Sequence, residues 1–165
     1  FPHMTVAENI GITLSLERQD QSRIDSRIDE LLELVHLKPS IFRNRWPQEL
    51  SGGQKQRVAL IRALAPAPGL ILADEPFGAL DPITRDSVQR EFQDIQKVLG
   101  FAAILVTHDM TEALTMADEI LVLKAGKMVQ LGTPQELLNK PATPYVEHLM
   151  STPKQQASRL NRLLQ

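Results

Sequence analysis

Two adjacent carboxylates follow a short apolar run near the middle of the chain. Asp74 and Glu75 come directly after Leu70–Ala73, and turn residues precede the run at 66–69. Such a run is typical of a buried parallel strand, and ligands bind at the carboxyl ends of strands in open α/β sheets. Mg²⁺ is usually held by one or two carboxylates together with phosphate oxygens. The pair therefore predicts a magnesium–phosphate site, and an ordinary strand end followed by an acidic turn is an equally good interpretation.

A histidine follows the next apolar run along the chain. Residues 102–108 predict a second buried strand that ends in Thr107 and His108. A lone histidine after a strand is more often a capped or surface residue than a catalytic one. Parallel neighbouring strands would, however, bring His108 to the same sheet edge as Glu75. There its imidazole could bind a γ-phosphate or orient a water.

A pair of glycines opens a predicted helix before the first strand. Ser51 and Gln54 have the spacing of a capping box, so Gly52 and Gly53 lie in the first helical turn. Unpaired N–H groups and the positive end of the helix dipole favour an anion at this place. A plain helix start is the alternative, but glycine is costly inside a helix. Two successive glycines therefore favour close approach of the backbone to a ligand.

The rest of the sequence predicts helices around an α/β core. A helix is predicted over 25–37, no strand over 1–65, and a helix from Pro82, capped by Asp81, to Gly100. A hairpin is predicted over 119–132, and Thr133–Glu136 forms a capping box. The tail has two short helical patterns, one of which carries Leu160, Leu163 and Leu164. Strand–helix–strand order predicts a parallel sheet.

Composition excludes several classes of protein. The 165 residues suffice for one domain with a core. The formal net charge is −2, and no run of basic residues forms a nucleic-acid-binding stripe. Direct binding of DNA or RNA is therefore not expected. Cysteine is absent, so disulfides and thiolate metal sites are excluded. Because no apolar run approaches the roughly 20 residues of a membrane-spanning helix, we expect none.

Four motifs in this order and spacing resemble ATP-binding cassette (ABC) ATPases. They are LSGGQ (50–54), LILADE (70–75), GALD (78–81) and VTHD (106–109), which are similar to the signature motif, Walker B, D-loop and H-loop. The resemblance implies a P-loop NTPase-type ABC ATPase fold, with ATP and Mg²⁺ as cofactors. It implies that Asp74 supports Mg²⁺, that Glu75 is the general base and that His108 contacts the γ-phosphate. Asp81 would lie at the contact between two cassettes.

Family resemblance also implies partners. ATP is sandwiched in a head-to-tail dimer, so Ser51, Gly52, Gly53 and Gln54 would close over nucleotide held by a second ATPase subunit. Longer stretches at 1–10, 77–85, 106–114 and 132–138 are similar to importers of quaternary amines such as glycine betaine, choline or carnitine. Importers of nitrate, sulfonate or polyamines share parts of them. The resemblance implies permease subunits, an indirect extracytoplasmic binding protein and a peripheral place on the cytoplasmic membrane face.

The family's phosphate-binding loop has no counterpart in the sequence. The motif G-x-x-x-x-G-K-[ST] holds the β- and γ-phosphates, whereas Gly126-Lys127 is followed by Met128 and preceded at the first glycine position by Leu121. We expect the Walker A loop and Q-loop upstream of Phe1. The fold is thus expected to be incomplete: a helical signature subdomain at 1–65, the C-terminal part of a RecA-like core at 66–140 and a helical tail at 141–165. By itself the chain is expected to be inactive, and a non-catalytic assembly module is the alternative function.

Overall fold

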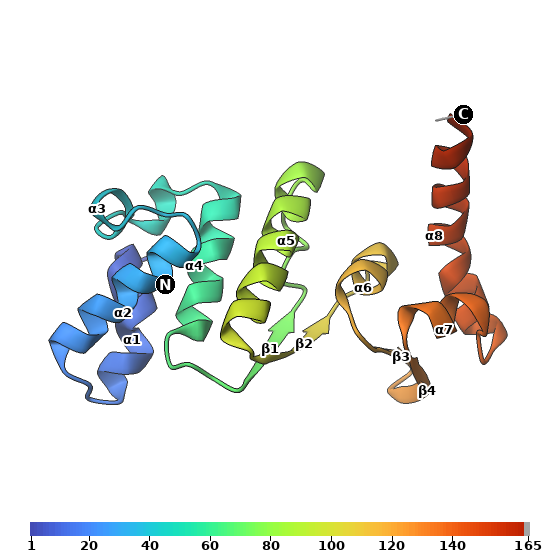
Figure 1. The fold of residues 1–165 in the computed structure, drawn as a ribbon, viewed down its shortest axis with the longest axis horizontal. Coiled ribbons are helices and arrows are strands. Elements are labelled where there is room, and N and C mark those ends of the chain that lie inside the picture. The colour runs from blue at the N-terminus through green and yellow to red at the C-terminus, as the bar shows by residue number, and fades with distance from the viewer. Residues whose placement is uncertain (164–165) are drawn as a thin grey trace. The chain divides into compact units, whose positions relative to one another are not determined.

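The computed structural model describes residues 1–163, with every side chain among them except that of Leu160. The chain divides into two compact units, Phe1–Val106 and Thr107–Gln165, each described by itself. The first unit contains α1 (Val6–Leu16), α2 (Gln21–Leu34), α3 (Pro39–Phe42), the 3₁₀ helix η1 (Pro47–Glu49), α4 (Gly52–Leu64), β1 (Leu70–Asp74), α5 (Pro82–Leu99) and β2 (Ala102–Val106). The second contains α6 (Met110–Met116), β3 (Ile120–Lys124), β4 (Lys127–Gly132), α7 (Pro134–Asn139) and α8 (Pro144–Leu163) (Figure 1).

Helices α1, α2 and α4 pack together at the start of the first unit (Figure 1). Their fully buried side chains include Ile10, Leu31 and Ile61. The predicted absence of strands over 1–65 is confirmed. Helix α2 begins at Gln21, four residues before the predicted start, and ends at Leu34.

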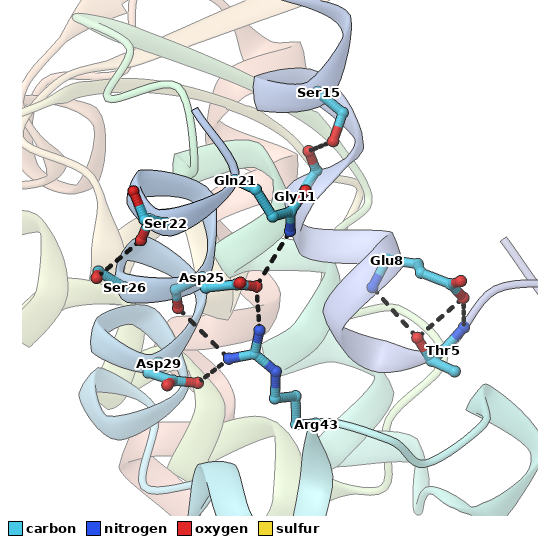
Figure 2. A network of polar contacts seen from close by, with 10 residues as sticks. All are labelled: Thr5, Glu8, Gly11, Ser15, Gln21, Ser22, Asp25, Ser26, Asp29 and Arg43. Atoms are coloured by element: carbon cyan, nitrogen blue, oxygen red, sulfur yellow. Dashed lines mark hydrogen bonds and ion pairs between the residues drawn. The ribbon is translucent and has the colours of Figure 1, made fainter. Parts of the chain in front are cut away.

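Arg43 fastens the segment after α3 to helix α2. Its guanidinium lies between the carboxylates of Asp25 and Asp29, one helical turn apart, and its Nη1 is 2.6 Å from Asp29 Oδ1 (Figure 2). Arginine suits this role because its planar fork can serve two acceptors at once. The contact holds the loop that leads toward the Ser51 turn against the helical layer.

Strands β1 and β2 form the predicted parallel pair. Asp74 is registered with Val106, so both strands end at one edge. Strand β2 ends two residues before the predicted His108. There the N–H of Asp109 donates to Thr107 Oγ1 at 3.0 Å, a local turn that competes with the strand ladder.

One side of this strand pair carries exposed apolar residues. Leu72 is 71% exposed and Ile104 is 55% exposed, whereas Ile71, which points to the other side, is buried. Alternation follows from the two-residue period of a strand. Among the described residues of this unit, helices therefore cover only one side of the pair.

Helix α5 has the predicted ends. Asp81 is its N-cap, and Gly100 ends it with φ +70°, a conformation that glycine adopts without strain. Val88, Phe92 and Ile95 are buried, whereas Leu99 in its last turn is 38% exposed.

The second unit is built on the predicted hairpin of β3 and β4, which turns at Ala125 and Gly126, both with positive φ. Its buried apolar side chains come from the hairpin, α7 and α8: Ile120, Val122, Leu137, Val146 and Met150. The predicted capping box of Thr133 and Glu136 is present.

The tail prediction of two short helical patterns is wrong, because α8 runs as one helix from Pro144 to Leu163. It continues through Pro153, which lacks only one backbone N–H and leaves the flanking turns intact. The side chain of Leu160 and all of Leu164 lie outside the described residues. Among residues 1–163, no helix is long and apolar enough to cross a membrane.

Candidate functional site

Asp74 and Glu75 lie exposed where β1 ends. Asp74 is the last residue of the strand, and the N–H of Glu75 still donates to the carbonyl of Val106 on β2 at 2.8 Å. The pair is thus fixed to the carboxyl end of the parallel strands, where α/β sheets bind ligands.

Glu75 has a strained backbone. Its φ is +45°, which is in the left-handed region that side chains other than glycine avoid. The turn closes when Gly78 N–H donates to the Glu75 carbonyl at 3.2 Å. Such strain persists only where surrounding contacts enforce it, and it is common at functional sites.

Buried aromatic and aliphatic side chains anchor the segment that follows. Phe77 is buried and packs edge-on against Phe92 of α5, with ring centroids 6.0 Å apart. Leu80 is buried as well. These anchors hold the 75–81 segment on the first unit and leave Glu75 and Asp81 at the surface.

Asp81 is both the cap of α5 and a proposed contact residue. Hydrogen bonds from the side chain and backbone of Thr84 hold the pKa of Asp81 below its usual value, and Ile83 N–H donates as well. The Asp81 carboxylate therefore stays charged. Its interaction with the positive end of the α5 dipole is favourable.

The predicted capping box of the Gly-Gly turn is present. Ser51 Oγ accepts from the N–H of Gln54 at 3.3 Å, and the Gln54 side chain accepts from Ser51 N–H at 3.0 Å. Ser51 and Gly52 are exposed. The turn can therefore present backbone N–H groups to an anion at the surface of the unit.

Gly53 has a packing role that the sequence did not reveal. A Cβ atom built on it would lie 2.7 Å from Thr84 Cγ2 of α5, well inside normal contact distance. Gly52 is less constrained, with Leu80 Cδ2 at 3.7 Å. Close approach of two helices is thus one reason for glycine at position 53, independent of any ligand.

Two residues just after this turn have partners that the sequence did not indicate. The Gln56 amide donates to the carbonyl of Pro76, and Arg57 Nε lies 2.6 Å from Glu91 Oε2 on α5. Because Arg57 and Glu91 are 34 positions apart, no local spacing could have paired them.

His108 belongs to the second unit, where it precedes α6 and is exposed. Along the chain, His108 lies two residues after Val106, the last residue of β2. The proximity of its side chain to Glu75 stays a prediction. Asp109, the next residue, caps α6 by accepting from the N–H groups of Thr111 and Glu112.

Within residues 1–163, no group of three or more histidine, cysteine or acidic side chains could enclose a metal ion. A Mg²⁺ site needs fewer protein ligands when phosphate oxygens supply the rest. The exposed carboxylates of Asp74 and Glu75 fit that kind of site, since both are acceptors at the strand edge.

Comparison with known proteins identifies the family. Residues 1–78 match the family described as ABC transporter. Over 150 residues, or 91% of its length, the chain is 51% identical to the glycine betaine/carnitine/choline transport ATP-binding protein of Bacillus subtilis. The chain belongs to the ABC transporter family of ATP-binding proteins.

Two Escherichia coli proteins show comparable similarity. Identity is 47% to a glycine betaine uptake system ATP-binding protein and 48% to a putrescine transport ATP-binding protein, each over 88% of this chain. The chain spans 39% of the Bacillus protein and 47% and 38% of these two. It thus corresponds to less than half the length of these relatives.

Proposed function

We propose that the chain is the ATP-binding and hydrolysing part of a bacterial ABC importer for quaternary amines. The observation that carries the proposal is the exposed Asp74–Glu75 pair at the carboxyl end of the parallel strands β1 and β2. Similarity to transport ATP-binding proteins over nine tenths of the chain supports the same function.

Asp74 and Glu75 have different roles in this proposal. Asp74 is the carboxylate for Mg²⁺, which neutralises phosphate charge when it is bound. Glu75 accepts a proton from water as the water oxygen bonds to the γ-phosphorus. The bond from that phosphorus to the bridging oxygen breaks, and ADP and phosphate are the products.

The other site residues act on the phosphates or on a partner. His108 donates a hydrogen bond to the γ-phosphate. The Ser51–Gln54 turn offers its N–H groups to nucleotide held by a second ATPase subunit, and Asp81 lies at the contact between the two. Permease subunits anchor the pair at the cytoplasmic face of the membrane, and an extracytoplasmic binding protein delivers the solute.

Glu75→Gln tests this assignment in the complete protein with its membrane subunits. A positioned general base contributes about 10²–10⁴-fold to rate, so kcat is expected to fall by that factor. ATP binding is expected to persist, because glutamine keeps the size of the side chain. Steady-state hydrolysis and equilibrium ATP binding measure the two effects separately.

Glu33→Gln is a matched control, because Glu33 is an exposed glutamate on α2. It should leave kcat unchanged. Undiminished hydrolysis by Glu75→Gln would exclude Glu75 as the base.

The proposed substrate class has one specific rival. The putrescine relative is as similar as the glycine betaine relative from the same organism, so a polyamine is the second candidate solute. Uptake of glycine betaine by the assembled transporter, unaffected by excess putrescine, would favour the quaternary amine. The opposite competition would favour the polyamine.

A non-catalytic assembly module is the second candidate function. The observation in its favour is that the 165 residues contain no G-x-x-x-x-G-K-[ST] motif. In that function the chain pairs with a cassette or permease and binds no ATP through a loop of its own.

A further inference from the structure

Helix α4 makes three contacts with the part of the first unit that follows β1. At its first turn, Gly53 lies against Thr84 of α5. One turn later, Gln56 and Arg57 reach Pro76 and Glu91. All three contacts lie within the first unit, and α4 and α5 run side by side there (Figure 1).

Gln56 holds the peptide that joins Pro76 to Phe77, one residue beyond Glu75. Its side-chain amide donates to the carbonyl of Pro76, next to the residue with φ +45°. A side chain of α4 thereby helps to fix the direction in which the Glu75 turn leaves the strand. Loss of this donor would free a strained turn to relax.

Arg57 forms a shielded ion pair with Glu91. Their side chains are only 25% and 11% exposed, and Arg57 Nε lies 2.6 Å from Glu91 Oε2. Within the described residues, Glu91 Oε1 is buried and accepts no hydrogen bond. A partly buried ion pair with one unpaired oxygen is weak evidence for stability, so its fixed geometry is the property that needs an explanation.

We propose that Gln56 and Arg57 are positioning residues that hold the Ser51–Gln54 turn and the Glu75–Asp81 segment as one rigid body. Nucleotide that engages the turn then sets the orientation of Glu75 in the same chain, although that nucleotide is held by the partner. This inference rests on the proposed function, because it assumes that Glu75 is the base.

The test uses the complete protein with its membrane subunits and compares Gln56→Met with Arg57→Met. Each variant keeps an unbranched side chain and removes the donor. Because small misplacements of a reacting group cost up to about 100-fold, we expect kcat to fall about tenfold. KM for ATP should stay within about twofold of the original value, since both side chains bind protein groups of the same unit, Pro76 and Glu91.

A double variant separates positioning from general weakening of the fold. Ser51→Ala impairs the turn itself. If Arg57 acts through the turn, adding Arg57→Met to Ser51→Ala lowers kcat by much less than tenfold. Independent, merely structural damage would multiply the two losses.

Arg90→Met is the matched control. Arg90 lies on α5 and pairs with Asp86 of the same helix, but both side chains are mostly exposed. It should leave kcat and KM unchanged. Should Arg57→Met fail to fold, Gln56→Met and the milder Arg57→Lys decide the question by the same criteria.

Two results would overturn the inference: original kcat in Gln56→Met and Arg57→Met, or multiplicative losses with Ser51→Ala. Glu75→Gln, measured in parallel, keeps the two hypotheses apart. If Glu75→Gln is inactive while these variants are fully active, only the positioning role fails. If Glu75→Gln is fully active, the proposed function itself fails.

Discussion

Gly53 has no side chain at the point where α4 begins beside α5. The sequence indicated close approach of the backbone to a ligand, and the structure adds close approach to Thr84. Both demands can hold at once, because the N–H group of a residue in the first turn and its missing Cβ point in different directions. The packing demand can be tested without nucleotide.

Gly53→Ala is expected to destabilise the protein by about 1–3 kcal/mol, the usual cost of overpacking. The added Cβ would lie 2.7 Å from Thr84 Cγ2, so either the Thr84 side chain or one of the helices must shift. Thr84→Ser removes that methyl group but keeps the hydroxyl beside Asp81. Thermal or denaturant unfolding of Gly53→Ala and of the double variant measures the cost and its recovery.

Gly52→Ala is the control, because its nearest neighbour, Leu80 Cδ2, lies at an ordinary 3.7 Å. It should cost less than Gly53→Ala. Equal losses at positions 52 and 53, or no recovery with Thr84→Ser, would contradict the packing role.

At the scale of elements, the α4–α5 contact contains a titrating group. Burial raises the pKa of Glu91 above its ordinary 4.5, and the charge of Arg57 only partly offsets this. Glu91 lies in a surface pocket that is also lined by His36, Arg90 and Asp94. A raised pKa means that the folded state binds the proton more tightly than the unfolded chain does.

Glu91 therefore contributes more stability in acid than at neutral pH. Its contribution is fully present below about 4.5 and is lost as the pH rises through the folded-state pKa. Compared with Glu91→Gln, which cannot ionise, the original protein should gain stability as the pH falls from 7 toward 4.5. Denaturant unfolding of both proteins across that range measures the difference.

Asp94→Asn is a control on the same helix, since the Asp94 carboxylate is exposed and faces Lys97. A trend with pH that Asp94→Asn shared would show that the effect is not specific to Glu91. A difference between Glu91→Gln and the original protein that is constant with pH would contradict a raised pKa of Glu91.

Elements with local signals were predictable. The ends of α5 follow from Asp81-Pro82 and Gly100, and the Ser51 and Thr133 capping boxes are found at the predicted residues. In each case the residues that determine the structure lie within four positions of it, so the sequence contains the whole cause.

Elements that depend on distant partners were not predictable. The Arg57–Glu91 pair joins residues on separate helices, and the Gly53–Thr84 contact depends on how those helices pack. The tail shows a different error, because the two short helical patterns predicted there belong to one continuous helix, α8, with Pro153 inside it. The roles of Asp74, Glu75 and His108 in catalysis stay predictions.

At the scale of the whole molecule, the 165 residues contain the proposed base, Glu75, but no G-x-x-x-x-G-K-[ST] motif. The 165 residues by themselves are therefore expected to show no measurable Mg-ATPase activity and only weak binding of ATP. Phosphate release and equilibrium binding, with circular dichroism to establish that the sample is folded, measure this. Robust hydrolysis by the 165 residues would contradict the expectation and exclude the assembly-module alternative.

The left-handed backbone of Glu75 has a consequence for protein design. A procedure that scores stability alone would place glycine at position 75, because glycine adopts φ +45° without a steric penalty. That exchange would also delete the carboxylate proposed to activate water. Stability-guided redesign of this protein should therefore hold position 75 fixed and seek its gains elsewhere.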